Sequence, residues 1–176
     1  MRLTDEKFDE LFDQVAVSAF RLESRATYHV EAEQGRLAQY RAGIVPRTRP
    51  DYPWRDYVAA ATQAGKSFER VHVVRQPLSE YVKFQCEYSY RHTVPAGEDV
   101  RILDTSLVDN PGLPNEDFWL FDDETVVRLD FHPDDRFDKA VLISDRLNEY
   151  RAYRQAALAT STAFTTYWST VCGPMT

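Results

Sequence analysis

The segment from Glu69 to Ile143 constrains the fold more than any other part of the chain, because it holds most of the β-forming residues. In order, it contains a β-branched run at 69–75, an amphipathic stretch at 78–90, strand-like runs at 100–103 and 118–121, and a hairpin pattern at 125–143. Short β-branched runs bounded by turn residues are typical of strands, and apolar residues at helical spacing are typical of helices. The segment therefore predicts a strand–helix–strand unit followed by a meander.

Helical patterns flank this segment on both sides. Thr4 is suited to cap one helix, Pro53 to begin another that Gly65 ends, and residues 31–41 have the pattern of a short third one. After the hairpin, Asp145 is expected to cap a single long helix. The apolar residues that recur on one side of this helix are Tyr150, Tyr153, Ala157, Phe164 and Trp168.

These patterns predict one α/β domain over residues 1–176. The chain length suits a single domain, and the hydrophobic fraction of 43% is that of an ordinary globular protein. We expect a mixed β-sheet of about five or six strands, with a C-terminal hairpin and flanking helices. A wholly parallel sheet is disfavoured because hairpin-connected strands are antiparallel.

The charge balance argues against direct nucleic-acid binding. The chain has 21 basic and 28 acidic residues, a net charge of −7, and its one basic cluster is the loop around Arg47 and Arg49. No apolar run reaches the ~18 residues needed to span a bilayer, and the first residues are acidic, unlike a signal peptide. We therefore expect no membrane association and a cytoplasmic protein, in which Cys86 and Cys172 are reduced thiols.

The chain lacks the common catalytic motifs. Its histidines, His29, His72, His92 and His132, form no zinc-binding spacing. Its six glycines are scattered and form no phosphate-binding loop, and no Gly-x-Ser-x-Gly elbow is present. The sequence therefore predicts no catalytic residue, no metal site and no cofactor.

Two short strands carry charged residues whose role has two interpretations. In the run Phe20–Glu23 the alternation predicts that Arg21 and Glu23 point outward, as exposed strand charges or as functional groups. In the run Asp117–Asp123, four bulky apolar residues predict a buried strand, and Asp122 belongs either to a turn or to a ligand-contacting strand end. The predicted core residues of this strand and the hairpin are Phe118, Leu120, Val127, Leu129 and Phe131.

The chain resembles an uncharacterised actinobacterial family, known as a domain of unknown function, whose genes often lie beside helix-turn-helix regulators. The resemblance rests on four runs that span most of the chain: Phe20–Glu23, Arg75–Tyr81, Ala96–Arg101 and Asp117–Asp122. It implies a regulatory role with a helix-turn-helix partner and brings no established activity.

A more distant similarity is to the phospholipase D-like fold, through the strand–helix–strand unit and the hairpin. Active members of that superfamily use a His-x-Lys motif with a nucleophilic histidine. Here the residues two positions after the histidines are Glu31, Val74, Val94 and Asp134. The similarity therefore implies that the nucleophile site has been lost and favours a binding role.

Three functional hypotheses follow. The first is a non-catalytic binding or regulatory module that acts with a partner protein. The second is an enzyme for small phosphorylated or acidic ligands, with Arg21, Arg75 and Arg101 as anion clamps and Glu23, Glu87 or Asp122 as acid–base groups. The third is a small-ligand sensor with an aromatic pocket around Trp119 and Tyr81. Convergence of the arginines and carboxylates in one pocket would favour the second or third hypothesis, and dispersal would favour the first.

Overall fold

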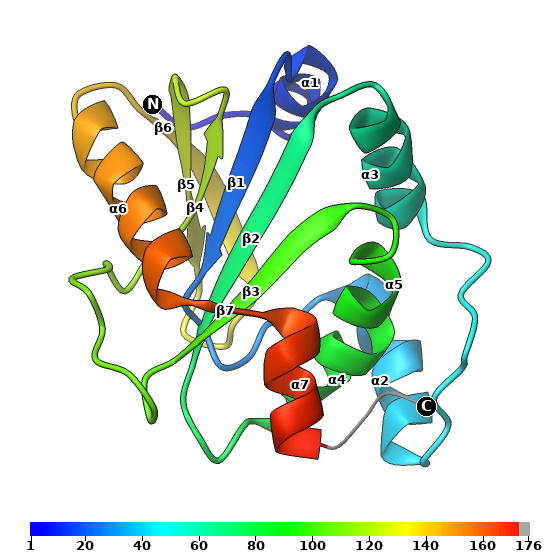
Figure 1. Ribbon diagram of the computed structural model, residues 1–176. Coiled ribbons are helices and arrows are strands. Elements are labelled where there is room, and N and C mark those ends of the chain that lie inside the picture. Colours follow the sequence, from blue (N-terminus) through cyan, green and yellow to red (C-terminus); the bar gives the residue numbers. More distant parts are fainter. Residues whose placement is uncertain (173–176) are drawn as a thin grey trace.

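The computed structural model describes residues 1–172 and shows one mixed sheet in the order β6-β5-β4-β1-β2-β3-β7 (Figure 1). Strands β1, β2 and β3 are mutually parallel, and the other neighbouring pairs are antiparallel. The strands are β1 Ser18–Glu23, β2 Ser67–Val74, β3 Glu98–Asp104, β4 Asp117–Phe121, β5 Thr125–Phe131, β6 Phe137–Ile143 and β7 Thr162–Ala163. The α/β class and the mixed sheet are as predicted, with seven strands in the described residues.

Three of the helices begin where the sequence supplies a capping side chain or a proline. Thr4 Oγ1 accepts the Lys7 N–H at 3.3 Å before α1, Ser79 Oγ accepts the Val82 N–H at 3.0 Å before α4, and Pro53 opens α3. The helices are α1 Asp5–Gln14, α2 Gln34–Arg41, α3 Pro53–Gln63, α4 Glu80–Gln85, α5 Arg91–Thr93, α6 Leu147–Thr160 and α7 Phe164–Cys172. A 3-10 turn, Glu31–Glu33, precedes α2, and a π-helical turn, Cys86–Tyr90, joins α4 to α5.

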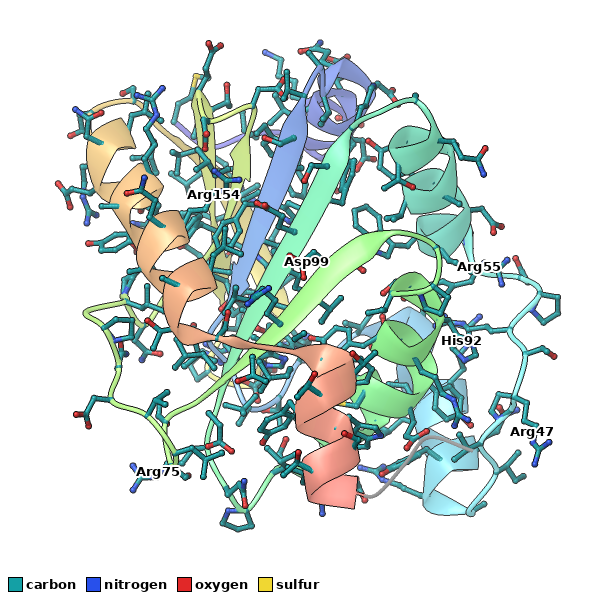
Figure 2. All side chains as sticks on the ribbon, in the orientation of Figure 1. Arg47, Arg55, Arg75, His92, Asp99 and Arg154 are labelled. Atoms are coloured by element: carbon teal, nitrogen blue, oxygen red, sulfur yellow. The ribbon has the colours of Figure 1, made fainter. Side chains whose placement is uncertain are left out.

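Helices cover both faces of the sheet (Figure 1). Helix α6 packs on one face, where its Tyr150 and Ala157 contact a core that includes Phe118 and Leu120. On the same helix, Arg154 forms an ion pair with Glu69 of β2 at 2.7 Å (Figure 2). Helices α1 and α3 cover one part of the opposite face, and α4 and α7 cover another part of it.

The hairpin prediction is confirmed, and the prediction for its core is partly wrong. Strands β5 and β6 pair antiparallel, with the expected turn between them. Phe118, Leu120 and Val127 are fully buried, whereas Leu129 and Phe131 are only half-buried. The difference arises because β5 lies near the edge of the sheet, where fewer elements cover its distal half.

The single long C-terminal helix is a wrong prediction. Helix α6 ends at Thr160, and Thr162–Ala163 pairs with Arg101 and Ile102 of β3 before α7 begins. The position before α6 is Arg146, and no side chain caps the helix there, so Asp145 is not its cap. The strand contact breaks the helix although its sequence contains no proline or glycine at this point.

Residues 1–172 contain no helix that combines the length and the apolar character needed to cross a bilayer. Cys86 is buried in the π-helical turn, where it packs as a small apolar core residue. The Cys172 side chain lies outside the described part of the chain.

Candidate functional site

The centre of the sheet holds a buried ionic cluster that begins with Arg21 and Glu23. Both residues are only 5% exposed, so the prediction that they point outward is wrong. Strand β1 lies between β2 and β4, and helices cover the face to which these two residues point. In the strand register, Arg21 pairs with Arg70 of β2 and Glu23 pairs with His72, which brings four ionisable side chains together.

Close ion pairs hold this cluster. Arg21 Nη2 lies 2.7 Å from Asp117 Oδ2 at the start of β4. Arg70 Nη1 lies 2.5 Å from Glu23 Oε1, and its Nε lies 2.9 Å from Glu98 Oε1 on β3. These side chains are between 0% and 12% exposed, so the pairs form where water does not screen them.

His72 makes a hydrogen-bonding contact through each of its two ring nitrogens. A carbonyl oxygen only accepts hydrogen bonds, so the 2.9 Å contact between His72 Nε2 and the Arg25 carbonyl oxygen requires a proton on Nε2. The single Tyr90 hydroxyl proton is donated to Glu23 Oε2 at 2.6 Å. His72 Nδ1 lies 2.8 Å from the Tyr90 oxygen, so Tyr90 joins the imidazole to the Glu23 carboxylate.

The environment of Glu23 keeps it ionised. Burial alone would raise the pKa of this carboxyl, but the charges of Arg70, His72 and Arg21 together lower the pKa to about 2. Burial and the same carboxylate raise the pKa of the Tyr90 phenol. The cluster thus brings together three basic side chains, Arg21, Arg70 and His72, and three carboxylates, Glu23, Glu98 and Asp117.

Two atoms of the cluster lack partners among the described residues. Arg21 Nη1 and Glu98 Oε2 are buried and make no hydrogen bond. Buried ion pairs of this kind contribute little net stability, because the cost of desolvation offsets their attraction. A contribution to stability alone therefore does not explain why the fold buries this cluster.

An aromatic pocket of about 410 Å³ opens next to the cluster, between α1 and α3. Phe12 lies 5.0 Å from Trp119 between ring centroids, and Trp54 lies 5.7 Å from Trp119 and stacks on Tyr57 at 5.5 Å. On the sheet side the lining includes Arg70, whose Cζ lies 5.8 Å from the Trp119 ring centroid. The pocket and the cluster thus share Arg70.

The mouth of this pocket is acidic. Asp9 and Asp13 line it, and both are exposed residues of α1, one helical turn apart. Burial and the nearby Asp13 carboxylate raise the pKa of the Tyr57 phenol, which places Asp13 close to the aromatic wall.

The other predicted anion clamps lie far from this site. Arg75 is exposed at the start of the loop after β2, and Figure 2 shows it at the lower edge of the molecule. Arg101 donates from Nε to Ser161 Oγ at 3.1 Å, next to β7. Glu87 forms an ion pair with Arg91 at 3.0 Å. The arginines and carboxylates proposed for one pocket are therefore dispersed, and only Arg21 and Glu23 meet.

Tyr81, Trp119 and Asp122 also lie in separate places. The Tyr81 hydroxyl donates to Glu33 Oε2 at 2.5 Å, and Tyr81 lines a different pocket from Trp119. The expected aromatic pocket therefore forms around Trp119 but without Tyr81. Asp122 accepts hydrogen bonds from three backbone N–H groups, those of Ala16, Val17 and Ser18. These are the contacts of a turn residue, which is the first of its two interpretations.

Sequence reasoning missed most of the cluster. The missed residues are Arg70, His72, Tyr90, Glu98, Asp117 and Tyr28, whose hydroxyl donates to Asp117 Oδ2 at 2.6 Å. One signal was available: ionisable residues two positions apart occur in both β1 and β2, so each strand presents its pair on one face.

The chain matches the family described as domain of unknown function, DUF6879, over residues 6–169. It belongs to the DUF6879 family. No curated protein matches it. The family match covers every member of the ionic cluster and all residues that line the aromatic pocket.

Proposed function

We propose that this DUF6879 protein is a non-catalytic binding module that acts with a partner protein. The observation that carries the proposal is the closed ionic cluster, in which each acid–base group already pairs with another. General acid–base catalysis needs a group within hydrogen-bonding reach of a substrate. Side chains that are 12% exposed or less give a substrate no such access.

The aromatic pocket is the docking site in this proposal. Protein interfaces are enriched in Trp, Tyr and Phe, and the residues that dominate their energy fill or line well-packed pockets. Phe12, Trp54, Tyr57 and Trp119 supply such a surface on the rigid support of two helices and the sheet. The cluster beneath them holds Arg70 in place, which preorganises the pocket.

We further propose a helix-turn-helix regulator as the partner, in the cytoplasm of an actinobacterium. The resemblance that associates the family with genes for such regulators supports this choice. The likeness to phospholipase D-like proteins fits a binding role, because none of the histidines is followed by the required lysine.

A sensor for a small anionic ligand is less well supported. An anion clamp needs guanidinium groups that are available to the ligand. Arg21 and Arg70 are already engaged by carboxylates at 2.7 and 2.5 Å.

Co-expression with the helix-turn-helix protein encoded beside the gene tests the proposal, with complex formation measured by size-exclusion chromatography and light scattering. We expect a stable complex that Trp54→Ala abolishes. The matched control is Phe137→Ala, which truncates an exposed aromatic residue on β6, away from the pocket. Absence of a complex with the wild-type chain would refute the proposed partnership. Turnover of a substrate that a folded Glu23→Gln variant loses would refute the non-catalytic role.

A further inference from the structure

We infer that the aromatic pocket accepts a cationic side chain, an arginine or lysine of the partner protein. The inference rests on the proposed function for the source of the side chain, and on the pocket itself for its chemistry.

The aromatic rings of the pocket favour a cationic side chain. The face of an aromatic ring carries partial negative charge and attracts a guanidinium or ammonium group within about 6 Å. Four rings surround the cavity, and Trp54 packs edge-to-face on Phe12 and Trp119 and stacks on Tyr57. A cavity of about 410 Å³ accommodates a long basic side chain.

The two carboxylates at the mouth of the pocket also favour a cationic side chain. Asp9 and Asp13 form no ion pair within the described residues, although both line the pocket. Their charges lie beside a low-dielectric aromatic surface, where the attraction of a cation is stronger than in bulk water. A neutral side chain would gain less from these two charges than a cation does, and an anion would be repelled by them.

Arg70 does not oppose a cation in this pocket. Its charge is offset by the two carboxylates that it contacts, Glu23 and Glu98. The field at the mouth is therefore set by the two aspartates. The net charge of −7 further favours the approach of a basic partner surface.

The test uses N-acetyl-arginine methylamide as the probe and N-acetyl-citrulline methylamide as its neutral counterpart. The three tryptophans provide the readout in two-dimensional NMR, because Trp54 and Trp119 line the pocket and Trp168 lies on α7. We expect saturable shifts of the Trp54 and Trp119 indole signals with the arginine probe and none of the Trp168 signal. Equal shifts with the citrulline probe would overturn the inference.

Charge variants separate the carboxylates from the rings. Asp9→Asn combined with Asp13→Asn should weaken arginine binding roughly tenfold, as expected for the loss of two partly screened charge contacts. The control, Glu6→Gln combined with Glu10→Gln, removes the same charge from exposed residues of α1 that do not line the pocket. Equal weakening by both pairs would overturn the inference, because the effect would then be one of overall charge.

The same variants distinguish this inference from the proposed function. If the regulator complex forms and Trp54→Ala abolishes it but the aspartate pair does not weaken it, the cationic anchor is wrong and the docking role stands. If the arginine probe binds as expected but no regulator complex forms, the pocket chemistry stands and the proposed partnership is wrong.

Discussion

Arg70 connects the pocket with the buried cluster: its Nη1 lies 2.5 Å from Glu23 Oε1, while the same guanidinium lines the aromatic cavity. Because Glu23 also accepts a hydrogen bond from Tyr90, Arg70 cannot move without disturbing a buried carboxylate. The shape of the pocket therefore depends on the integrity of the cluster.

Replacement of Glu23 by Gln should strongly destabilise the fold. The change removes the negative charge that faces Arg70 and His72, and breaking a buried pair from one side costs about 3–5 kcal/mol. Urea denaturation measures the free energy of unfolding. The control is Glu124→Gln, an exposed residue after β4 whose replacement should be nearly neutral. Equal stability of the two variants would contradict the description of the cluster.

The stability of the protein should fall on acidification in a way that depends on Glu23. The pKa of this carboxyl is about 2 in the folded protein, below its ordinary value of 4.5. A lowered folded-state pKa stabilises the fold above the unfolded-state value, and this contribution is lost as the pH falls from about 4.5 toward about 2. Urea midpoints at about pH 6 and about pH 3 should therefore differ more for the wild type than for Glu23→Gln. An identical loss in both would show that other carboxylates account for it.

Phe118→Ala should cost about 3–5 kcal/mol of stability, the usual range for truncating a buried phenylalanine. The Phe118 ring is fully buried and lies 4.7 Å from Tyr150 of α6 and 5.8 Å from Phe20 of β1, between centroids. Thermal unfolding provides the measurement, and Phe137→Ala, at a position 44% exposed, provides the control with a much smaller effect. An unchanged melting temperature for Phe118→Ala would contradict the burial of β4.

The protein alone should not bind duplex DNA tightly. Within the basic loop, Arg49 stacks on Tyr52 at 3.5 Å and donates to the Tyr88 carbonyl oxygen, so it is engaged in the fold. Figure 2 shows Arg47 in the same loop and Arg55 on the helix that follows it, α3. Each phosphate that a protein neutralises adds about 0.9 to the slope of log affinity against log salt, and this chain offers few such contacts. A mobility-shift titration at near-physiological salt decides the matter. Sub-micromolar specific binding without a partner would defeat the prediction.

The elements of the fold were predictable where local patterns determine them. Alternation and turn residues identify the β5–β6 hairpin, and Pro53 and Gly65 delimit α3. The burial of Arg21 and Glu23 was not predictable in the same way. Their partners Asp117 and Arg70 are 96 and 47 residues away in sequence, so the interactions that offset the cost of burying them depend on strand order. Strand order arises from long-range pairing that no local pattern encodes.

The π-helical turn Cys86–Tyr90 has a consequence for the evolution of this family. Such a turn holds one residue more than an α-helical turn, and here it brings Tyr90 to His72 while Tyr88 packs against Phe84. Deletion of one residue from it would restore a regular helix and rotate everything that follows by about 100° around the helix axis. Tyr90 would then leave the imidazole and the Glu23 carboxylate that it now joins. Relatives that retain the His72–Tyr90–Glu23 arrangement should therefore retain the helix length to the residue, whereas relatives that have lost it are free to vary in length at this point.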